Sequence, residues 1–289
     1  MPNGIIIIDK QPGWTSMDVC AKLRGLFHEK RIGHAGTLDP MATGVLPVFI
    51  GRATRAVEFA DKGEKEYVAG LKLGLVTNTQ DTSGEVLEQH PVHVTAQQLN
   101  DVLPRFQGDI EQIPPMFSAI KINGKKLYEL ARKGREVERP ARPVTIHSLT
   151  LEEQIAPDEF IVRVRCSKGT YVRTLCHDIG AALGCGGCMS SLRRTMAAGF
   201  TLEQSVTLEQ LQQTDDPTAH LLSIDLLFAH LPTLTLQGKP ETMLRNGMKL
   251  VMPQLSTGEY RVYGADGTFL ALCRAQEGKL ITTKSFFEV

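Results

Sequence analysis

The 289-residue sequence lacks any long apolar segment. Its N-terminal apolar run is four isoleucines at residues 5–8, and no basic residue precedes it. This run is far too short for a signal peptide or a spanning helix. No other stretch approaches the roughly 18 apolar residues that a spanning helix needs. We therefore expect a protein with no membrane partner.

Cysteine is sparse, with six residues at irregular spacings in a long chain. Cys185 and Cys188 form a CxxC pair, but no second CxxC and no histidine pair follow at zinc-finger spacing. Reduced thiols are the rule in the cytosol. We therefore expect free cysteines, no metal site and a cytoplasmic protein.

Several catalytic motifs are also missing. The chain has no GxxxxGK[ST] phosphate loop, no GxSxG elbow, no HExxH, no GxGxxG after a strand and no spaced set of histidines and carboxylates. These absences argue against nucleotide hydrolysis, serine-esterase chemistry, zinc-protease chemistry and dinucleotide redox chemistry. The class that remains is a reaction performed by a carboxylate without metal or cofactor.

Net charge is absent too, because 32 Lys and Arg residues balance 32 Asp and Glu residues. A zero sum argues against binding nucleic acid through bulk charge. However, residues 121–142 hold eight basic and three acidic residues, and residues 163–194 hold six basic and one acidic, while acidic segments at 81–111 and 203–225 offset them. Such basic segments suit phosphate contacts, although an ordinary solvated surface would have the same composition. The candidate RNA-binding residues are Lys121, Arg132, Arg142 and Arg193.

The spacing of apolar residues predicts both strands and helices. Residues 4–8 are a continuous β-branched run, typical of a strand buried on both faces, whereas residues 67–73 and 160–164 alternate. Residues 172–183 follow helical spacing, and Gly184 ends that helix. Because strands and helices mix without a strict βαβ rhythm, we expect an α+β fold.

Helix-capping residues and glycine-containing breaks indicate how the chain is divided into elements and domains. Thr15 or Ser16 can cap one helix, and Thr95 opens a capping box for another. A helical stretch is predicted around residues 221–228, and short strand-like runs separated by glycines follow it. We therefore predict a catalytic domain over residues 1–231 and a small β-rich domain over residues 232–289.

Two side chains stand out as candidates for chemistry. Asp39 lies in a glycine-rich segment, and Pro40 biases it towards an extended conformation, so it could act as a nucleophile or base, although Asp-Pro is also ordinary turn chemistry. Arg173 falls in a first helical turn, where the helix dipole does not favour a cation. It therefore needs an anionic partner, either a carboxylate or a phosphate. Tyr67, at a strand start, would normally be packing.

Together these segments resemble the TruB-type pseudouridine synthases. Residues 9–16 (DKQPGWTS) match the family's DKPxGxTS opening, and residues 33–46 match its GHxGTLDPxATGVL motif. The remaining matching segments, in the family's order, are residues 65–67, 114–121, 128–132, 168–175 and 192–194. The resemblance spans residues 4–231, and the C-terminal unit is similar to a PUA-like RNA-binding domain.

The resemblance implies a mixed or antiparallel sheet and isomerisation of uridine to pseudouridine at position 55 of the tRNA T loop. It implies base flipping without a cofactor, a monomer acting on the T stem-loop, no obligate protein partner, and assistance to tRNA folding. Asp39 would be catalytic, Tyr67 would stack on the flipped base and take a ribose proton, and Arg173 would pair with Asp39. Lys10, Tyr171 and Leu192 would line the pocket, and His34 would help hold the RNA loop in its extruded form.

Two departures and two alternatives accompany this interpretation. Phe117 stands where many members have tyrosine, and residues 185–188 replace a stretch usually rich in Ala and Gly. An RNA chaperone with secondary catalysis is one alternative, and a carboxylate-dependent nucleoside or glycoside hydrolase is another, which would need a second carboxylate beside Asp39. Whether Asp39 attacks the ribose or the base ring stays open.

Overall fold

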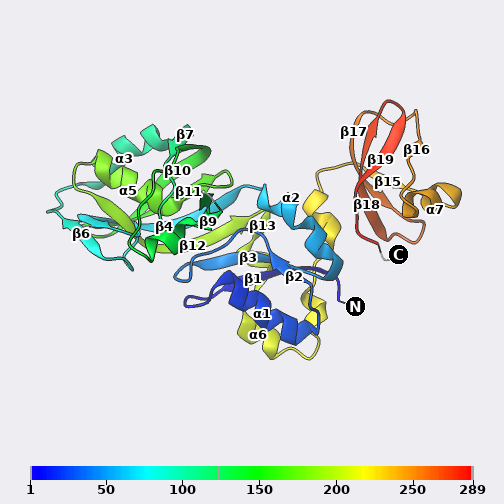
Figure 1. Ribbon diagram of the computed structural model, residues 1–289, viewed down its shortest axis with the longest axis horizontal. Coiled ribbons are helices and arrows are strands. Elements are labelled where there is room, and N and C mark those ends of the chain that lie inside the picture. Colours follow the sequence, from blue (N-terminus) through cyan, green and yellow to red (C-terminus); the bar gives the residue numbers. More distant parts are fainter. Residues whose placement is uncertain (1, 123, 288–289) are drawn as a thin grey trace.

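A computed structural model describes residues 2–122 and 124–287, and a large mixed sheet forms its centre (Figure 1). From edge to edge its strands are β14 (Ser205–Val206), β1 (Gly4–Lys10), β3 (Thr43–Ile50), β12 (Gly187–Ala197), β4 (Lys65–Leu73), β11 (Glu159–Cys166), β10 (Arg142–Ala156) and β7 (Gly108–Gln112). Strand β2 (Ile32–His34) adds to β3, and β13 (Phe200–Thr201) adds to β12. Most neighbours are antiparallel, but β1–β14 and β3–β12 are parallel. The predicted α+β class and mixed sheet are confirmed.

Strand β1 is buried on both faces, as its isoleucine run predicts. Ile6 and Ile8 join one core, which also holds apolar residues of α1 (Ser16–Phe27), α3 (Ala96–Val102) and α5 (Val172–Ala182). Ile5 and Ile7 point into a second core on the opposite face. Alternate side chains of one strand therefore belong to different cores.

The predicted helix starts are also present. Thr15 caps α1 and Thr95 caps α3, each through a complete capping box. The helix expected at residues 221–228 is wrong in part, because only η5 (Ile224–Phe228) and the preceding η4 (Pro217–His220) form, both as 3-10 turns. Leu222 exchanges backbone hydrogen bonds with Ile5 of β1, which holds this segment extended.

Smaller elements surround the sheet. They are η1 (Gly51–Ala56), α2 (Val57–Asp61), β5 (Leu75–Thr77), β6 (Val86–Gln89), η2 (Leu103–Phe106), β8 (Lys121–Ile122), β9 (Lys125–Lys126), α4 (Leu127–Ala131), η3 (Leu202–Gln204) and α6 (Leu208–Gln212). None of the described helices is long and apolar enough to cross a membrane.

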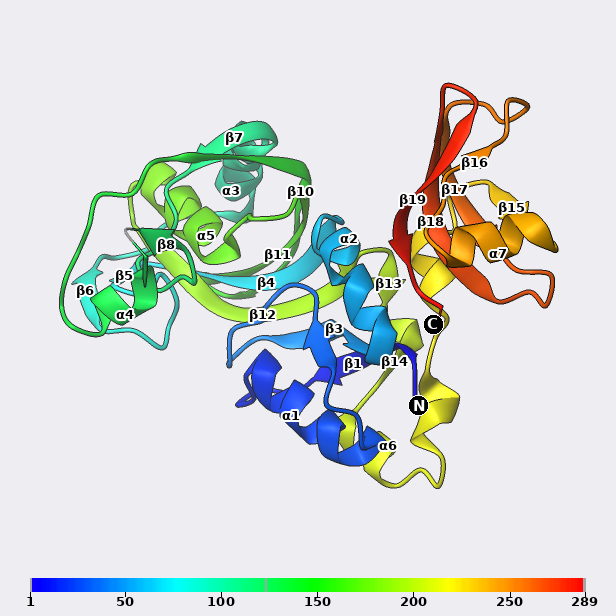
Figure 2. The same cartoon turned by 45° about the vertical axis from the view of Figure 1, so that its right-hand side comes forward.

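The C-terminal residues form a separate small sheet (Figure 2). Its order is β15 (Thr233–Thr235), β17 (Gly258–Tyr263), β18 (Phe269–Gln276), β19 (Lys279–Ser285) and β16 (Leu250–Val251), with α7 (Lys239–Arg245) beside it. Phe269 and Phe286 pack with Phe228 of η5, and Lys284 forms a 2.6 Å ion pair with Glu58 of α2. The prediction of a β-rich C-terminal domain is confirmed.

Candidate active site

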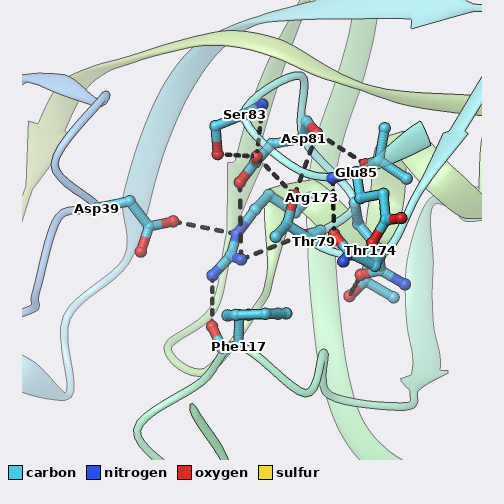
Figure 3. A network of polar contacts seen from close by, with 11 residues as sticks. Asp39, Thr79, Asp81, Ser83, Glu85, Phe117, Arg173 and Thr174 are labelled. Atoms are coloured by element: carbon cyan, nitrogen blue, oxygen red, sulfur yellow. Dashed lines mark hydrogen bonds and ion pairs between the residues drawn. The ribbon is translucent and has the colours of Figure 1, made fainter. Parts of the chain in front are cut away.

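Asp39 and Arg173, far apart in sequence, meet in an ion pair (Figure 3). Asp39 lies in the loop between β2 and β3, and Arg173 lies in the first turn of α5. The Nε atom of Arg173 is 3.0 Å from Oδ2 of Asp39, and the side chains are 7% and 37% exposed respectively. The carboxylate is therefore accessible to a ligand while its partner is buried. The anionic partner that Arg173 required is this carboxylate.

Asp81, which in the sequence is only the first residue of an acidic segment, extends this pair into a network. Its Oδ2 lies 3.8 Å from Nη1 of Arg173, and its Oδ1 accepts hydrogen bonds from the hydroxyls of Thr79 (2.8 Å) and Ser83 (2.5 Å). Arg173 also donates to the carbonyls of Thr79 and Phe117. Figure 3 shows the guanidinium enclosed by these groups. With its donors engaged from several sides, Arg173 can hold Asp39 in one direction.

We expect Asp81→Asn to slow the reaction at this site about 100-fold, the scale on which a misplaced reacting group lowers a rate. The change keeps the size of Asp81 but removes the charge that orients Arg173. Single-turnover kinetics measures the effect. Glu85→Gln removes an exposed carboxylate from the same turn and serves as the matched control. Equal rates for both variants would show that Asp81 does not position Arg173.

Tyr67 lies on β4 beside this network and is 7% exposed. It pairs in register with Val164 of β11 on one side and Arg194 of β12 on the other. Burial raises the pKa of the phenol, so Tyr67 is a neutral ring at physiological pH. A neutral aromatic ring in an apolar setting is suited to stacking on a base.

Lys10, at the end of β1, is only 1% exposed. Its Nζ donates to the carbonyls of Gln11 (2.9 Å), Trp14 (2.7 Å) and Pro40 (3.2 Å). Burial is the main cause that lowers the pKa of Lys10 to about 8; Asp39 opposes the shift and Arg194 adds to it. Lys10 therefore ties the loop that carries Asp39 to the start of α1.

Activity should fall as the pH rises through about 8, because Lys10 then loses its charge and one of its three donors. Single-turnover rates across neutral and alkaline pH test this. Lys10→Arg keeps its charge over that range, so the remaining activity of this variant should not decline there. The same descending limb in Lys10→Arg would assign the titration to another group.

The other predicted pocket residues lie around the same centre. Burial lowers the pKa of His34, whose Nδ1 is buried without a hydrogen-bond partner among the described residues. The side chain of Gln112 holds the backbone of Tyr171 through two hydrogen bonds. Its Oε1 accepts from the Tyr171 backbone NH at 3.0 Å, and its Nε2 donates to the Tyr171 carbonyl at 3.3 Å. Leu192 lies on β12, is 9% exposed and shares a core with Tyr67. Their roles stay predictions.

The basic segments differ from each other. Lys121, Arg132 and Arg142 are exposed, and Arg132 lies over the Tyr128 ring at 5.4 Å. Much of the second segment is instead engaged within the protein: Arg193 holds Asp9 with two hydrogen bonds of 2.8 and 3.2 Å. Arg163, Arg165 and Arg173 also form ion pairs. The first segment is therefore the better candidate for phosphate contacts, and the role of Arg193 stays a prediction.

The cysteines form no disulfide among the described residues. Each cysteine is free and buried. Over residues 2–122 and 124–287, no group of three or more His, Cys, Asp or Glu side chains is placed to hold a metal ion.

Comparison with known proteins places this site in a family. A model of the TruB family pseudouridylate synthase N-terminal domain matches residues 24–172, and a model of the tRNA pseudouridylate synthase B C-terminal domain matches residues 173–228. The chain belongs to the TruB family of pseudouridylate synthases. It is therefore an isomerase, and the resemblance found in its motifs is confirmed. The small C-terminal sheet lies beyond both matched ranges.

TruB family relatives match along most of the chain. The tRNA pseudouridine synthase B of Azoarcus sp. (strain BH72) is 44% identical over 96% of this chain and 93% of that protein. That of Heliobacterium mobile is 47% identical over 87% of this chain and 82% of that protein. A crystal structure of a Cbf5-Nop10-Gar1 complex is similar at a TM-score of 0.74 and 26% identity, covering 98% of this chain and 85% of that one. An H/ACA RNP bound to a substrate RNA containing 2'-deoxyuridine is similar at 0.73 and 25% identity, covering 99% and 85%.

Proposed function

We propose that this protein isomerises the uridine at position 55 in the T loop of tRNA, with Asp39 as the catalytic carboxylate. The observation that carries the proposal is the accessible Asp39 carboxylate held by buried Arg173 at 3.0 Å. The TruB family supplies the reaction type, and relatives named tRNA pseudouridine synthase B support tRNA as the substrate. The protein acts as a single chain on free tRNA and needs no cofactor.

The reaction fits the geometry. Isomerisation breaks the bond between ribose C1′ and uracil N1, turns the ring and joins it again through C5. It requires a carboxylate at the ribose, a surface that holds the loose ring, and exclusion of water. Asp39 is the carboxylate, Tyr67 provides a buried face for stacking, and Leu192 lines the same core. A loop base must leave its stack to reach them, at a cost of a few kcal/mol.

A nucleoside or glycoside hydrolase fits less well. Such an enzyme uses two carboxylates that flank the bond, and Asp81 is the one linked to Asp39 through Arg173. Asp81 is only 5% exposed, and its Oδ1 is occupied by Thr79 and Ser83. It therefore orients Arg173 and does not act on substrate.

The test is incubation with unmodified full-length tRNA, followed by mapping of pseudouridine at every uridine. The proposal expects a single product at position 55. A matched tRNA with cytidine at that position should gain no pseudouridine anywhere. Product at another position would assign the enzyme to a different uridine, and product in the cytidine control would contradict the T-loop specificity.

The exposed residues Lys121, Arg132 and Arg142 support a second activity, assistance to tRNA folding, because flipping a loop base opens the tRNA elbow. The Asp39→Asn variant separates the two activities. It should still accelerate the folding of a misfolded tRNA while forming no pseudouridine. Loss of both activities together would remove the folding role.

Phosphate contacts by Arg132 and Arg142 should appear in the salt dependence of binding. Charge reversal, as Arg132→Glu or Arg142→Glu, should reduce the slope of log K against log salt by roughly one per contact, with position 55 still the modified uridine. Glu136→Lys adds a positive charge at an exposed position between these two arginines in the sequence and should steepen the slope. An unchanged slope in the arginine variants would show that neither arginine contacts phosphate.

A further inference from the structure

Arg194 is a buried cation without a carboxylate partner in the part of the chain that the structure describes. It is 0% exposed. Its Nε donates to the carbonyl of Val45 at 2.7 Å and its Nη2 to the carbonyl of Gly36 at 3.0 Å, while Nη1 is buried without a partner. A buried charge is costly unless it is paired. In the sequence, Arg194 stands next to Arg193 in a segment that matches the family.

Lys10 and Lys65 share this arrangement. Lys65 is 8% exposed, and its Nζ donates to the carbonyls of Asp61 and Gly63, both at 3.2 Å. Like Lys10 and Arg194, it bonds only to neutral backbone oxygens, and none of the three belongs to an ion pair among the described residues. Three basic side chains are thus buried with no carboxylate bonded to them, and burial lowers the pKa of Lys65 as it does that of Lys10.

These cations surround the loop that carries Asp39. Arg194 binds the carbonyls of Gly36 and Val45, on either side of Asp39, and Lys10 binds that of Pro40. A Cβ on Gly36, where φ is +73°, would lie 3.2 Å from Nη1 of Arg194 and 3.0 Å from Cε of Lys65. On β12, Arg194 also pairs in register with Gly44 and Tyr67. Its backbone and side chain therefore connect both catalytic elements.

We propose that Arg194 is a positioning residue that fixes the Asp39 loop against Tyr67, and that its unpaired charge, with those of Lys10 and Lys65, stabilises negative charge developing on the uracil ring. This inference rests on the proposed function of the Asp39 site. Positive charge fixed before the reaction, in a site that excludes water, is an effective way to lower a barrier. The contribution of Arg194 to the lowered pKa of Lys10 is consistent with such a field.

The electron balance shows where this charge acts. When the C1′–N1 bond breaks, its electron pair leaves with the ring, which becomes an anion. When C5 bonds to C1′, a ring electron pair makes the new bond, C5 loses its proton and N1 gains one. The anion is temporary, and no oxidant or reductant is involved. If Asp39 adds to the ring instead, the ring still carries the negative charge.

The test compares Arg194→Gln with wild type on T stem-loops that carry uridine or 5-fluorouridine at position 55. Fluorine stabilises the ring anion, so removal of a positive charge from the site should lower the rate less for 5-fluorouridine than for uridine. Because fluorine also blocks loss of a proton from C5, the rate is followed as consumption of the N-linked nucleoside. We expect a loss of about 100-fold or more on uridine and at least a tenfold smaller loss on 5-fluorouridine. RNA affinity should stay within threefold of wild type.

Equal losses on both substrates would overturn the electrostatic role. If Arg194→Gln does not fold, Lys65→Gln replaces it in the test, because this change removes a neighbouring basic group. Its loss of rate should again be larger on uridine than on 5-fluorouridine, by a smaller factor than for Arg194→Gln. Arg194→Lys keeps the charge without the two-carbonyl fork, so its losses on the two substrates should be equal. Asp39→Asn should be inactive on both. Activity in Asp39→Asn would contradict the proposed function itself, separately from the ratio that tests Arg194.

Discussion

Asp39→Asn is expected to reduce pseudouridine formation by a factor on the order of 10⁴ or more, the scale on which loss of an essential reacting group acts. Asparagine has the shape of aspartate but can neither attack a carbon atom as a nucleophile nor accept a proton as a carboxylate does. Because Asp39 is a partly exposed loop residue, the change should leave the fold and the RNA affinity close to wild type. Single-turnover kinetics with saturating enzyme measures the loss.

Asp9→Asn is the matched control for this experiment. Asp9 is also a partly exposed carboxylate in an arginine ion pair, with Arg193 at 2.8 Å, but it lies outside the Asp39–Arg173 network. Its substitution should change the rate no more than a few-fold. A near wild-type rate in Asp39→Asn would remove the assignment of the catalytic carboxylate, whatever the control shows.

Arg173→Met should have the second largest effect, on both stability and activity. Arg173 is 6% exposed and contacts Asp39, Asp81, Thr79 and Phe117. Removing it leaves the buried carboxylate of Asp81 without its cation. Breaking a buried pair in this way typically costs about 3–5 kcal/mol. We expect a loss of that size in the free energy of unfolding, together with a rate too low to measure.

Arg173→Lys separates charge from geometry. Lysine keeps the positive charge but cannot present the fork that reaches the carboxylates and carbonyls together. Its stability should lie nearer wild type, while its rate should stay about 100-fold low. Arg163→Met, which breaks partly exposed ion pairs with Glu66 and Glu152, is the stability control and should cost about 1 kcal/mol or less. Full activity in Arg173→Lys would show that charge alone is needed.

Local features of the sequence predicted much of the fold. The continuous β-branched run in residues 4–8 predicted a doubly buried strand because a strand covered on both faces needs apolar side chains at every position. The caps at Thr15 and Thr95 predicted helix starts because each is a self-contained hydrogen-bonding unit. The segment at 221–228 was misjudged because its conformation depends on pairing between Leu222 and Ile5, which no local pattern records.

The site was predictable where motifs are contiguous. Asp39 and Arg173 were each unusual in their local setting, and the family resemblance paired them. Asp81 was overlooked because it stands in an acidic segment that resembles a solvated surface, yet it is 5% exposed. Arg194 was overlooked because burial of a cation on a central strand leaves no signal in an Arg-Arg pair. Both depend on tertiary packing.

The oppositely charged segments of the sequence contact each other in the structure. Acidic and basic segments that cancel in the total meet in space: Asp81 belongs to the first acidic segment, and Arg173 to the second basic one. Exposed basic residues of the first basic segment include Lys121, Arg132 and Arg142, and this segment begins four residues after Phe117, whose carbonyl accepts a hydrogen bond from Arg173. The residues proposed to contact phosphate therefore follow closely, along the chain, a residue that contacts Arg173.

The most direct test of the account is a crystal structure of the Asp39→Asn variant bound to an unmodified T stem-loop. We expect uridine 55 to be flipped out of the loop, with its ring stacked on Tyr67 and its ribose in contact with residue 39. A complex in which that base stays stacked within the RNA, or lies away from residue 39 and Tyr67, would contradict it.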